Sequence, residues 1–327
     1  MHSTASSEPL RDLIGYGPEP PHVEWPDGRT LALNIAVNYE EGAEANPLTG
    51  DPRDSRTWVL APDLPASERD LNQEGEWEYG SRVGIWRLLR MFGEYEMPFS
   101  VFATAKALDV HPPLTSALRS APCDIVAHSF RSVRNRAATE SEQRANLRQA
   151  VDLLQSLTGK PVMSSFAPPL TTSTRRLVAE EGLLYDSATT NDDIPYYATV
   201  SGRPLLVVPY ALDTNDARFW GGASGPGFMT GEEFFGYLRD ALDLLRREAR
   251  QVPRMMSIGL HARIMRPARA MALQRFLDYV HGLPDVWIAR RNDIALTFAR
   301  QFAPENAWNY SAGQHAPERS ADRKLHA

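Results

Sequence analysis

The chain has 327 residues and a formal net charge of -6, so it is long enough to bury a sizeable core but lacks the basic surface of a nucleic-acid-binding protein. The single cysteine, Cys123, excludes an intramolecular disulfide framework. The first residues show no charged-then-apolar signal pattern and no apolar run is long enough for a bilayer. We therefore expect a cytoplasmic protein whose partners are neither membranes nor nucleic acid.

The first 80 residues contain one strand signal between two irregular segments. Residues 1–29 are rich in proline, glycine and charge and predict an N-terminal arm that lies over the body of the protein. The apolar run 31–37 predicts the first buried strand. Residues 43–80 contain four prolines and several acidic residues. A loop of this length in a compact domain is more often a functional cover than a plain connection.

From residue 81 onward, helix and strand signals alternate. The capping-box pairs Thr139 with Glu142 and Thr230 with Glu233 indicate where two of the helices begin. We expect helices over 81–96, 139–158, 172–181, 230–250 and 267–281, and a last one from 292. We expect strands over 98–103, 124–127, 161–166, 182–185, 205–208, 255–260 and 286–289. The polar stretch 303–327 lacks periodicity and is expected to be a mobile tail.

This alternation predicts an α/β fold, with a mostly parallel sheet wrapped by helices in a single domain over 30–302. No glycine-rich dinucleotide fingerprint follows the first strand, and no phosphate loop occurs anywhere. We therefore expect a closed or nearly closed barrel in preference to an open doubly wound sheet.

Candidate chemical groups follow four of the predicted strands: the pair Glu40–Glu41, His128, Asp186 and His261. The carboxyl ends of parallel barrel strands meet at one mouth, where such folds keep their chemistry, so an enzyme is the leading interpretation. A carboxylate in a closed, partly dry site can take a proton from water. Adjacent strand residues point to opposite faces, so only one glutamate would face the axis unless the chain bends at Gly42. A solvated strand end is the alternative.

The two histidines differ in how strongly the sequence singles them out. His261 lies between an apolar run and a basic turn that contains Arg263. Its imidazole is suited to transferring a proton to a departing nitrogen. His128 could instead be a structural residue with satisfied hydrogen bonds.

Six further residues are candidates for binding a substrate. Asp186 and Asp192 could orient a histidine or bind substrate N–H groups, although an exposed acidic loop explains Asp192 better. Asp216 belongs to a polar segment that is either a recognition loop or a hydrogen-bonded turn. The complete candidate set is Tyr39, Arg131, Asp186, Asp192, Asp216 and Arg263.

Several motifs together resemble the NodB-type polysaccharide deacetylase superfamily over residues 11–299. Within it the chain is most similar to the metal-independent allantoinase and cyclic-imide-hydrolase branch. The resemblance implies a distorted (β/α) barrel and a homo-oligomer, either a dimer or a tetramer. The motifs that carry it lie at 11–17, 38–42, 79–82, 174–178, 184–187, 192–196, 209–216 and 259–261.

By this resemblance, Glu40 and Glu41 occupy the position of an Asp-Asp motif that supplies a base and a metal ligand in zinc deacetylases. His128 matches the first of two histidine ligands, and His261 matches the late catalytic histidine. The second histidine ligand would fall at Ser132. Glu41 and His128 alone give two ligands where zinc usually takes three from the protein, so we expect no tightly bound metal and no cofactor.

The leading hypothesis is a hydrolase that cleaves a non-peptide C–N bond in a small cyclic amide, ureide or imide. Glu40 or Glu41 would activate water, and His261 would protonate the departing nitrogen or stabilise the oxyanion. His128, with Arg131, would polarise the carbonyl. The segment 161–174 lacks an arginine that relatives carry, which motivates one alternative: a redirected or lapsed barrel in a biosynthetic pathway. The other is a zinc-dependent sugar deacetylase with altered ligands at Glu41 and His128.

Overall fold

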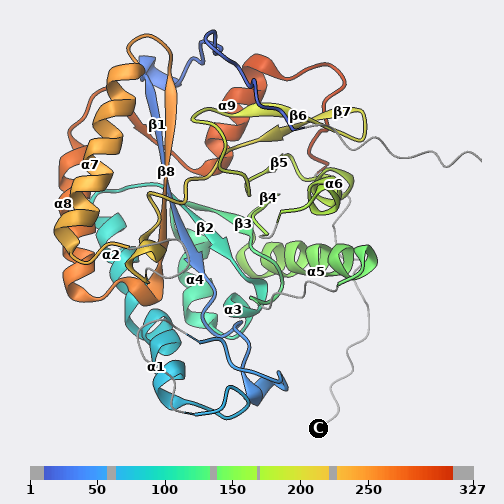
Figure 1. Ribbon diagram of the computed structural model, residues 1–327, viewed down its shortest axis with the longest axis vertical. Helices are drawn as coiled ribbons and strands as arrows, with labels where there is room; N and C mark the ends of the chain where they lie inside the picture. Colours follow the sequence, from blue (N-terminus) through green and yellow to red (C-terminus); the bar gives the residue numbers. More distant parts are fainter. Residues whose placement is uncertain (1–10, 57–63, 133–137, 168–169, 221–226, 312–327) are drawn as a thin grey trace, which may run out of the picture.

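The computed structural model describes residues 11–56, 64–132, 138–167, 170–220 and 227–311. Within these residues the core is a nine-stranded sheet in the order β6-β7-β5-β4-β3-β2-β1-β8, with β9 also paired to β1 (Figure 1). All pairs are parallel except the β6–β7 hairpin. The strands are β1 (Leu31–Tyr39), β2 (Phe99–Ala103), β3 (Cys123–Ala127), β4 (Val162–Ser165), β5 (Tyr185–Asp186), β6 (Tyr196–Val200), β7 (Arg203–Val207), β8 (Arg254–His261) and β9 (Val286–Ile288).

The sheet curls into a distorted barrel, which confirms the predicted fold class. Instead of a strand pair, the segment after β7 connects the β7 side of the sheet to β8. Asn215 forms an isolated parallel bridge with Gly259, and the Thr214 hydroxyl donates to the Ser257 carbonyl at 2.6 Å. A loop therefore fills the gap through which an ideal barrel would close.

Helices cover the outside of this sheet, with α7 and α8 packed side by side along one flank (Figure 1). The predicted helices and both capping boxes are confirmed, at Thr139 for α5 and at Thr230 for α7. The helices are α1 (Leu71–Tyr79), α2 (Ile85–Glu94), α3 (Ala105–Asp109), α4 (Pro112–Ser120), α5 (Glu140–Thr158), α6 (Thr172–Glu180), α7 (Gly231–Glu248), α8 (Pro267–His281) and α9 (Arg291–Phe302).

Three helices and one strand were not expected from the sequence: α1, α3, α4 and β6. The segment 43–80 is consequently not irregular throughout, because its last part is α1, which continues through a π-helical turn (Gly80–Gly84) into α2. The predicted strand over 182–185 is reduced to the two residues of β5.

A fully buried arginine, Arg291 at the start of α9, forms hydrogen bonds to several segments inside the barrel. Its guanidinium donates to the side chains of Asn34 and Ser257 and to the carbonyl oxygens of Val208 and Pro209, at 2.5–3.2 Å. These partners lie on β1, on β8 and just after β7. One cation therefore links both sides of the gap in the sheet, and burial lowers the pKa of Arg291.

The described parts of the two terminal segments lie against the body. In the arm, Val23 and Trp25 are buried and the Tyr16 hydroxyl donates to the Pro195 carbonyl at 2.9 Å. Near the other end, the guanidinium of Arg203 stacks over the ring of Trp308 at 4.0 Å. Residues 1–10 of the predicted arm and 312–327 of the predicted tail lie outside the described residues.

None of the helices in the described ranges is both long enough and apolar enough to cross a membrane.

Candidate active site

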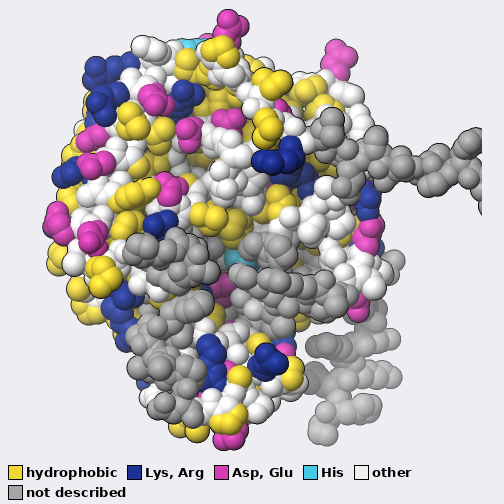
Figure 2. All heavy atoms as spheres, viewed as in Figure 1, with side chains coloured by type: hydrophobic (Ala, Val, Ile, Leu, Met, Phe, Trp, Pro, Cys, Tyr) yellow, Lys and Arg dark blue, Asp and Glu magenta, His cyan; other side chains and the backbone are white. Residues whose placement is uncertain are grey.

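A cavity of about 860 Å³ opens where the strands end at their carboxyl termini. Glu40 and Asn38 come from the end of β1, His128 follows β3, Ser165 ends β4 and His261 ends β8. In the space-filling view a histidine and an acidic side chain are visible at the bottom of a central hollow (Figure 2). Parallel strands therefore bring residues up to 223 positions apart into one site.

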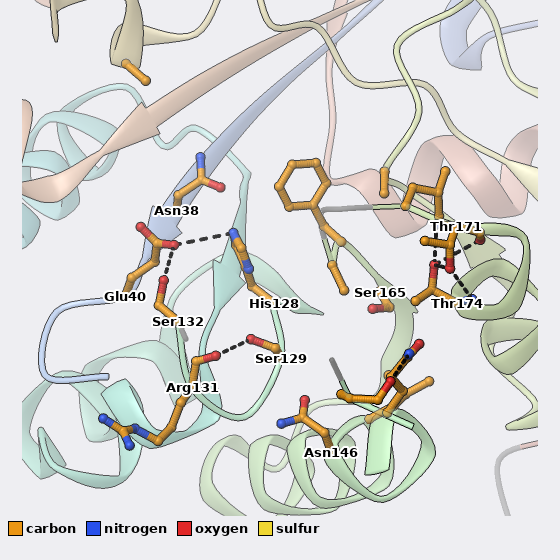
Figure 3. Close-up of a pocket in the computed structure, with 18 of the residues that line it drawn as sticks. Asn38, Glu40, His128, Ser129, Arg131, Ser132, Asn146, Ser165, Thr171 and Thr174 are labelled. Atoms are coloured by element: carbon orange, nitrogen blue, oxygen red, sulfur yellow. Dashed lines mark hydrogen bonds and ion pairs between the residues drawn. The ribbon is translucent and has the colours of Figure 1, made fainter. Parts of the chain in front are cut away.

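Glu40 reaches this cavity and is surrounded by donors. Its Oε1 accepts from the Ser132 hydroxyl at 2.9 Å and lies 3.6 Å from His128 Nε2 (Figure 3), while its Oε2 accepts from Arg263 Nη2 at 2.7 Å. Burial would raise the pKa of Glu40, but the charges of Arg263, His128 and His261 outweigh it and hold this pKa below its ordinary value. Glu40 is therefore ionised at neutral pH.

Glu41 turns away from the cavity. Its carboxylate accepts from the backbone N–H groups of Glu40 (3.0 Å) and Arg263 (3.2 Å) and from Arg263 Nη1 (3.3 Å). It lies against Gly80, where an added Cβ would clash with the carboxylate. Burial raises the pKa of Glu41 and Arg263 opposes this only in part. Of the two adjacent glutamates, Glu40 is the one that can meet a bound molecule.

Arg263 is a cation that is paired with both carboxylates. Its guanidinium is buried and lies near two indole rings, 4.1 Å from the centroid of Trp77 and 5.1 Å from that of Trp220. Burial would lower the pKa of Arg263, but Glu40 and Glu41 raise it. The two rings therefore provide cation–π contacts to the guanidinium that also meets both acids.

His261 is oriented by a carboxylate that sequence reasoning placed in a substrate loop. Asp216 Oδ1 lies 2.7 Å from His261 Nδ1, and Asp216 Oδ2 accepts from the His261 backbone N–H at 2.8 Å. Since a carboxylate only accepts, the proton of a neutral His261 resides on Nδ1 and Nε2 is left as an acceptor. Asp216 is 0% exposed and does not line the cavity, so it does not contact a molecule bound there.

His128 lines the same cavity as His261, with its ring edge-on to Phe166 at a centroid distance of 5.1 Å. Its Nδ1 is buried and has no hydrogen-bond partner among the described residues. Burial lowers the pKa of His128, although Glu40 opposes this. His128 is therefore largely neutral at pH 7.

Three of the predicted substrate-binding residues are occupied elsewhere. The Tyr39 hydroxyl is hydrogen-bonded to His111 at 2.7 Å and lies outside the cavity. Arg131 lines the cavity, but its guanidinium points away from Glu40 (Figure 3) and binds Asp51 at 2.6 Å, which fastens the covering segment 43–80. Asp192 lines a neighbouring cavity and not this one. These placements correct the expectation that all six residues share one site.

Asp186 and Arg263 do lie at the predicted cavity. The Asp186 carboxylate is already paired with Arg175 Nε at 2.8 Å. Among the residues not predicted, Asn38, Trp77 and Trp220 also line it. No local pattern singles out the two tryptophans, because nothing in the sequence relates them to Arg263.

The side chains present do not fit a zinc site. No group of three or more histidine, cysteine, aspartate or glutamate side chains converges as metal ligands in the part of the chain that the structure describes. The pair proposed from the sequence, Glu41 and His128, is separated because Glu41 faces Gly80. Arg263 already supplies a positive charge to Glu40, and Ser132 is a hydrogen-bond donor to it.

Comparison with known proteins agrees with this architecture. The sequence profile described as polysaccharide deacetylase matches residues 76–183. A polysaccharide deacetylase-family protein of Schizosaccharomyces pombe is 33% identical over 310 residues, which cover 87% of this chain and 95% of that protein.

Two solved structures are also similar over most of the chain. The structure of PuuE allantoinase is 41% identical, with a TM-score of 0.85 over 90% of this chain and 98% of that one. A probable polysaccharide deacetylase from Pseudomonas aeruginosa PAO1 is 42% identical, with a TM-score of 0.84 over 89% and 98%. Given the fold, the strand-end site and these similarities, the chain belongs to the polysaccharide deacetylase family.

Proposed function

We propose that this protein hydrolyses a C–N bond in a small cyclic amide, ureide or imide. The observation that carries the proposal is the His261–Asp216 pair at the same cavity as an ionised Glu40. The similarity to PuuE allantoinase, at 41% identity over nearly the whole chain, supports the substrate class.

His261 is suited to move the proton. Its Nε2 can accept a proton from water as that water attacks the carbonyl carbon, and Asp216 stabilises the imidazolium that forms. The C–N bond then breaks as Nε2 returns the proton to the departing nitrogen, which leaves as an amine or amide. The other product is a carboxylic acid, which releases its remaining proton to solvent and becomes a carboxylate. One histidine thus serves both steps without a net change in its protonation.

Glu40 is better suited to orienting water than to removing its proton. General-base catalysis is most effective when the pKa of the base lies near the working pH, and the pKa of Glu40 is held low by Arg263. This assignment differs from the sequence hypothesis, in which a glutamate was the base. The carboxylate still attracts and directs a water through the hydrogen bonds it can accept.

Charge that develops on the carbonyl oxygen needs a donor or a cation nearby. His128 lines the cavity in a largely neutral form, and a neutral imidazole can donate one hydrogen bond to that oxygen. The buried guanidinium of Arg263 lines the same cavity, 2.7 Å from Glu40 Oε2, and supplies a fixed positive charge there. We assign these two residues the electrostatic role that the sequence hypothesis gave to His128 with Arg131.

The direct test is turnover of allantoin, hydantoin, dihydrouracil and succinimide by the purified protein, with Glu40→Gln and His261→Ala as variants. We expect kcat/KM on the best substrate to fall about 10²- to 10⁴-fold in each. His281→Ala, at the exposed end of α8, is the matched control and should retain full activity. Turnover that survives both active-site substitutions would contradict the assigned roles.

A second candidate is removal of an acetyl group from an acetamido sugar, which membership of the polysaccharide deacetylase family favours. It predicts release of acetate from N-acetylglucosamine oligomers and no opening of cyclic amides. Stoichiometric zinc in the purified protein, lost together with activity on chelation, would favour this candidate over the first.

A further inference from the structure

The cavity is larger than one small ring requires. A volume of about 860 Å³ falls within the range of about 300–1,000 Å³ typical of pockets that enclose drug-sized ligands. The groups assigned to catalysis occupy only one end of it. The remainder is a second compartment whose lining differs in chemistry from the catalytic end.

This second compartment lies between α5, α6 and the end of β4. Figure 3 shows Glu40, His128 and Ser132 on one side of the cavity and Thr171 and Thr174 on the other, with Ser165 between them. The walls beyond Ser165 combine a buried apolar cluster with polar side chains of α5 and α6. The members of this cluster are Leu147 on α5, Phe166 after β4, and Leu177 and Val178 on α6.

The two acidic side chains at this end already have hydrogen-bond partners within the fold. The Glu142 carboxylate accepts from the backbone N–H and hydroxyl of Thr139, at 2.7 and 2.9 Å, in the capping box of α5. Asp186 is paired with Arg175 at 2.8 Å. Both acids are therefore held by donors of the fold, with the charge of Asp186 paired to Arg175, and the threonine hydroxyls are engaged in the α6 cap.

We propose that this compartment binds an aryl or branched alkyl substituent carried by the ring that is hydrolysed. The identity of the ring rests on the proposed function, whereas the compartment rests on its own lining. The buried apolar cluster favours an apolar group through the surface it removes from water. The preferred substrate is then a substituted cyclic amide or imide and not the bare ring.

Calorimetric titration of the full-length protein with hydantoin and with 5-benzylhydantoin tests this directly. We expect the benzyl compound to bind at least about 10-fold more tightly, as burial of an aromatic ring permits. Gln143→Trp, on the cavity side of α5, fills the compartment and should reduce the difference to less than about 3-fold. Ala145→Trp adds the same ring at an exposed position of the same helix and should leave the preference intact.

The outcomes separate this inference from the proposed function. Tighter binding of the benzyl compound that is lost in Gln143→Trp supports the compartment even if neither compound is hydrolysed, in which case only the proposed function fails. Equal affinity for the two compounds, no binding of either, or a preference that survives Gln143→Trp would overturn the inference.

Discussion

Replacing Arg263 by methionine removes the one arginine or lysine that is paired with both buried carboxylates among the residues that the structure describes. The guanidinium lies 2.7 Å from Glu40 and 3.3 Å from Glu41, and the two acids are 8% and 2% exposed. A charge pair about 4 Å apart is worth roughly 4 kcal/mol at an effective dielectric constant near 20. Breaking a buried ion pair by removing one partner typically costs about 3–5 kcal/mol. We therefore expect Arg263→Met to lower the free energy of unfolding by that amount at pH 7.

The loss should depend on pH, because removing Arg263 reverses the direction in which the pKa of Glu40 is shifted. In the wild type the pKa of Glu40 is lowered, so its contribution to stability is present above the unfolded-state pKa and is lost as pH falls toward the folded-state pKa. Without Arg263, burial would raise the pKa of Glu40, and protonation would then stabilise the variant as pH falls. The difference in free energy of unfolding should therefore shrink between pH 7 and pH 4.

The measurement is urea unfolding, followed by far-ultraviolet circular dichroism, of the wild type, Arg263→Met, Glu41→Gln and the double variant. The free energy of unfolding of the double variant should fall by about 1–3 kcal/mol less than the sum of the two single losses. The reason is that Glu41→Gln removes one of the two negative charges that Arg263 would otherwise offset. Losses that add within about 0.5 kcal/mol, or a loss for Arg263→Met that is independent of pH, would refute the electrostatic argument.

Three further substitutions test the site and the barrel interior. Asp216→Asn should lower kcat/KM by about 10²- to 10⁴-fold with little change in KM. The control Asp213→Asn, at an exposed position of the same segment, should leave turnover intact. Similar effects of the two substitutions in steady-state kinetics would contradict the role of Asp216 in orienting His261. Burial raises the pKa of Asp124 to about 6, above its unfolded-state value. As pH rises from 4 to 7, the free energy of unfolding of the wild type should therefore fall by roughly 3 kcal/mol relative to that of Asp124→Asn. A difference in free energy of unfolding between the two proteins that is constant with pH would contradict the raised pKa. Arg291→Met leaves buried hydrogen-bond acceptors without a donor and should lower the free energy of unfolding by about 3 kcal/mol or more. Arg290→Met breaks a partly exposed ion pair and should lower it by less than about 1 kcal/mol. Equal shifts of the two variants in thermal unfolding would contradict the assigned role of Arg291.

Local sequence signals predicted the elements in which they are strong. The capping boxes at Thr139 and Thr230 and the amphipathic stripes behind them located α5 and α7 correctly, because an N-cap and its helix lie within a few residues of each other. The missed elements have weaker signals. Helix α4 begins with two prolines, which resemble a loop, although proline is favoured in the first turn of a helix. Strand β6 is a half-exposed partner of β7 without a continuous apolar run.

The arrangement of the site divides in the same way. The sequence by itself placed Glu40, His128 and His261 at the ends of parallel strands, and such ends share one edge of a sheet whatever the loops do. The tertiary structure alone decided which glutamate faces the cavity, since β1 ends at Tyr39 and period-two alternation no longer sets the side-chain direction beyond it. It also decided that Asp216 orients His261 from 45 residues away. Such pairings depend on where loops pack against the sheet, and no local pattern in the chain encodes that.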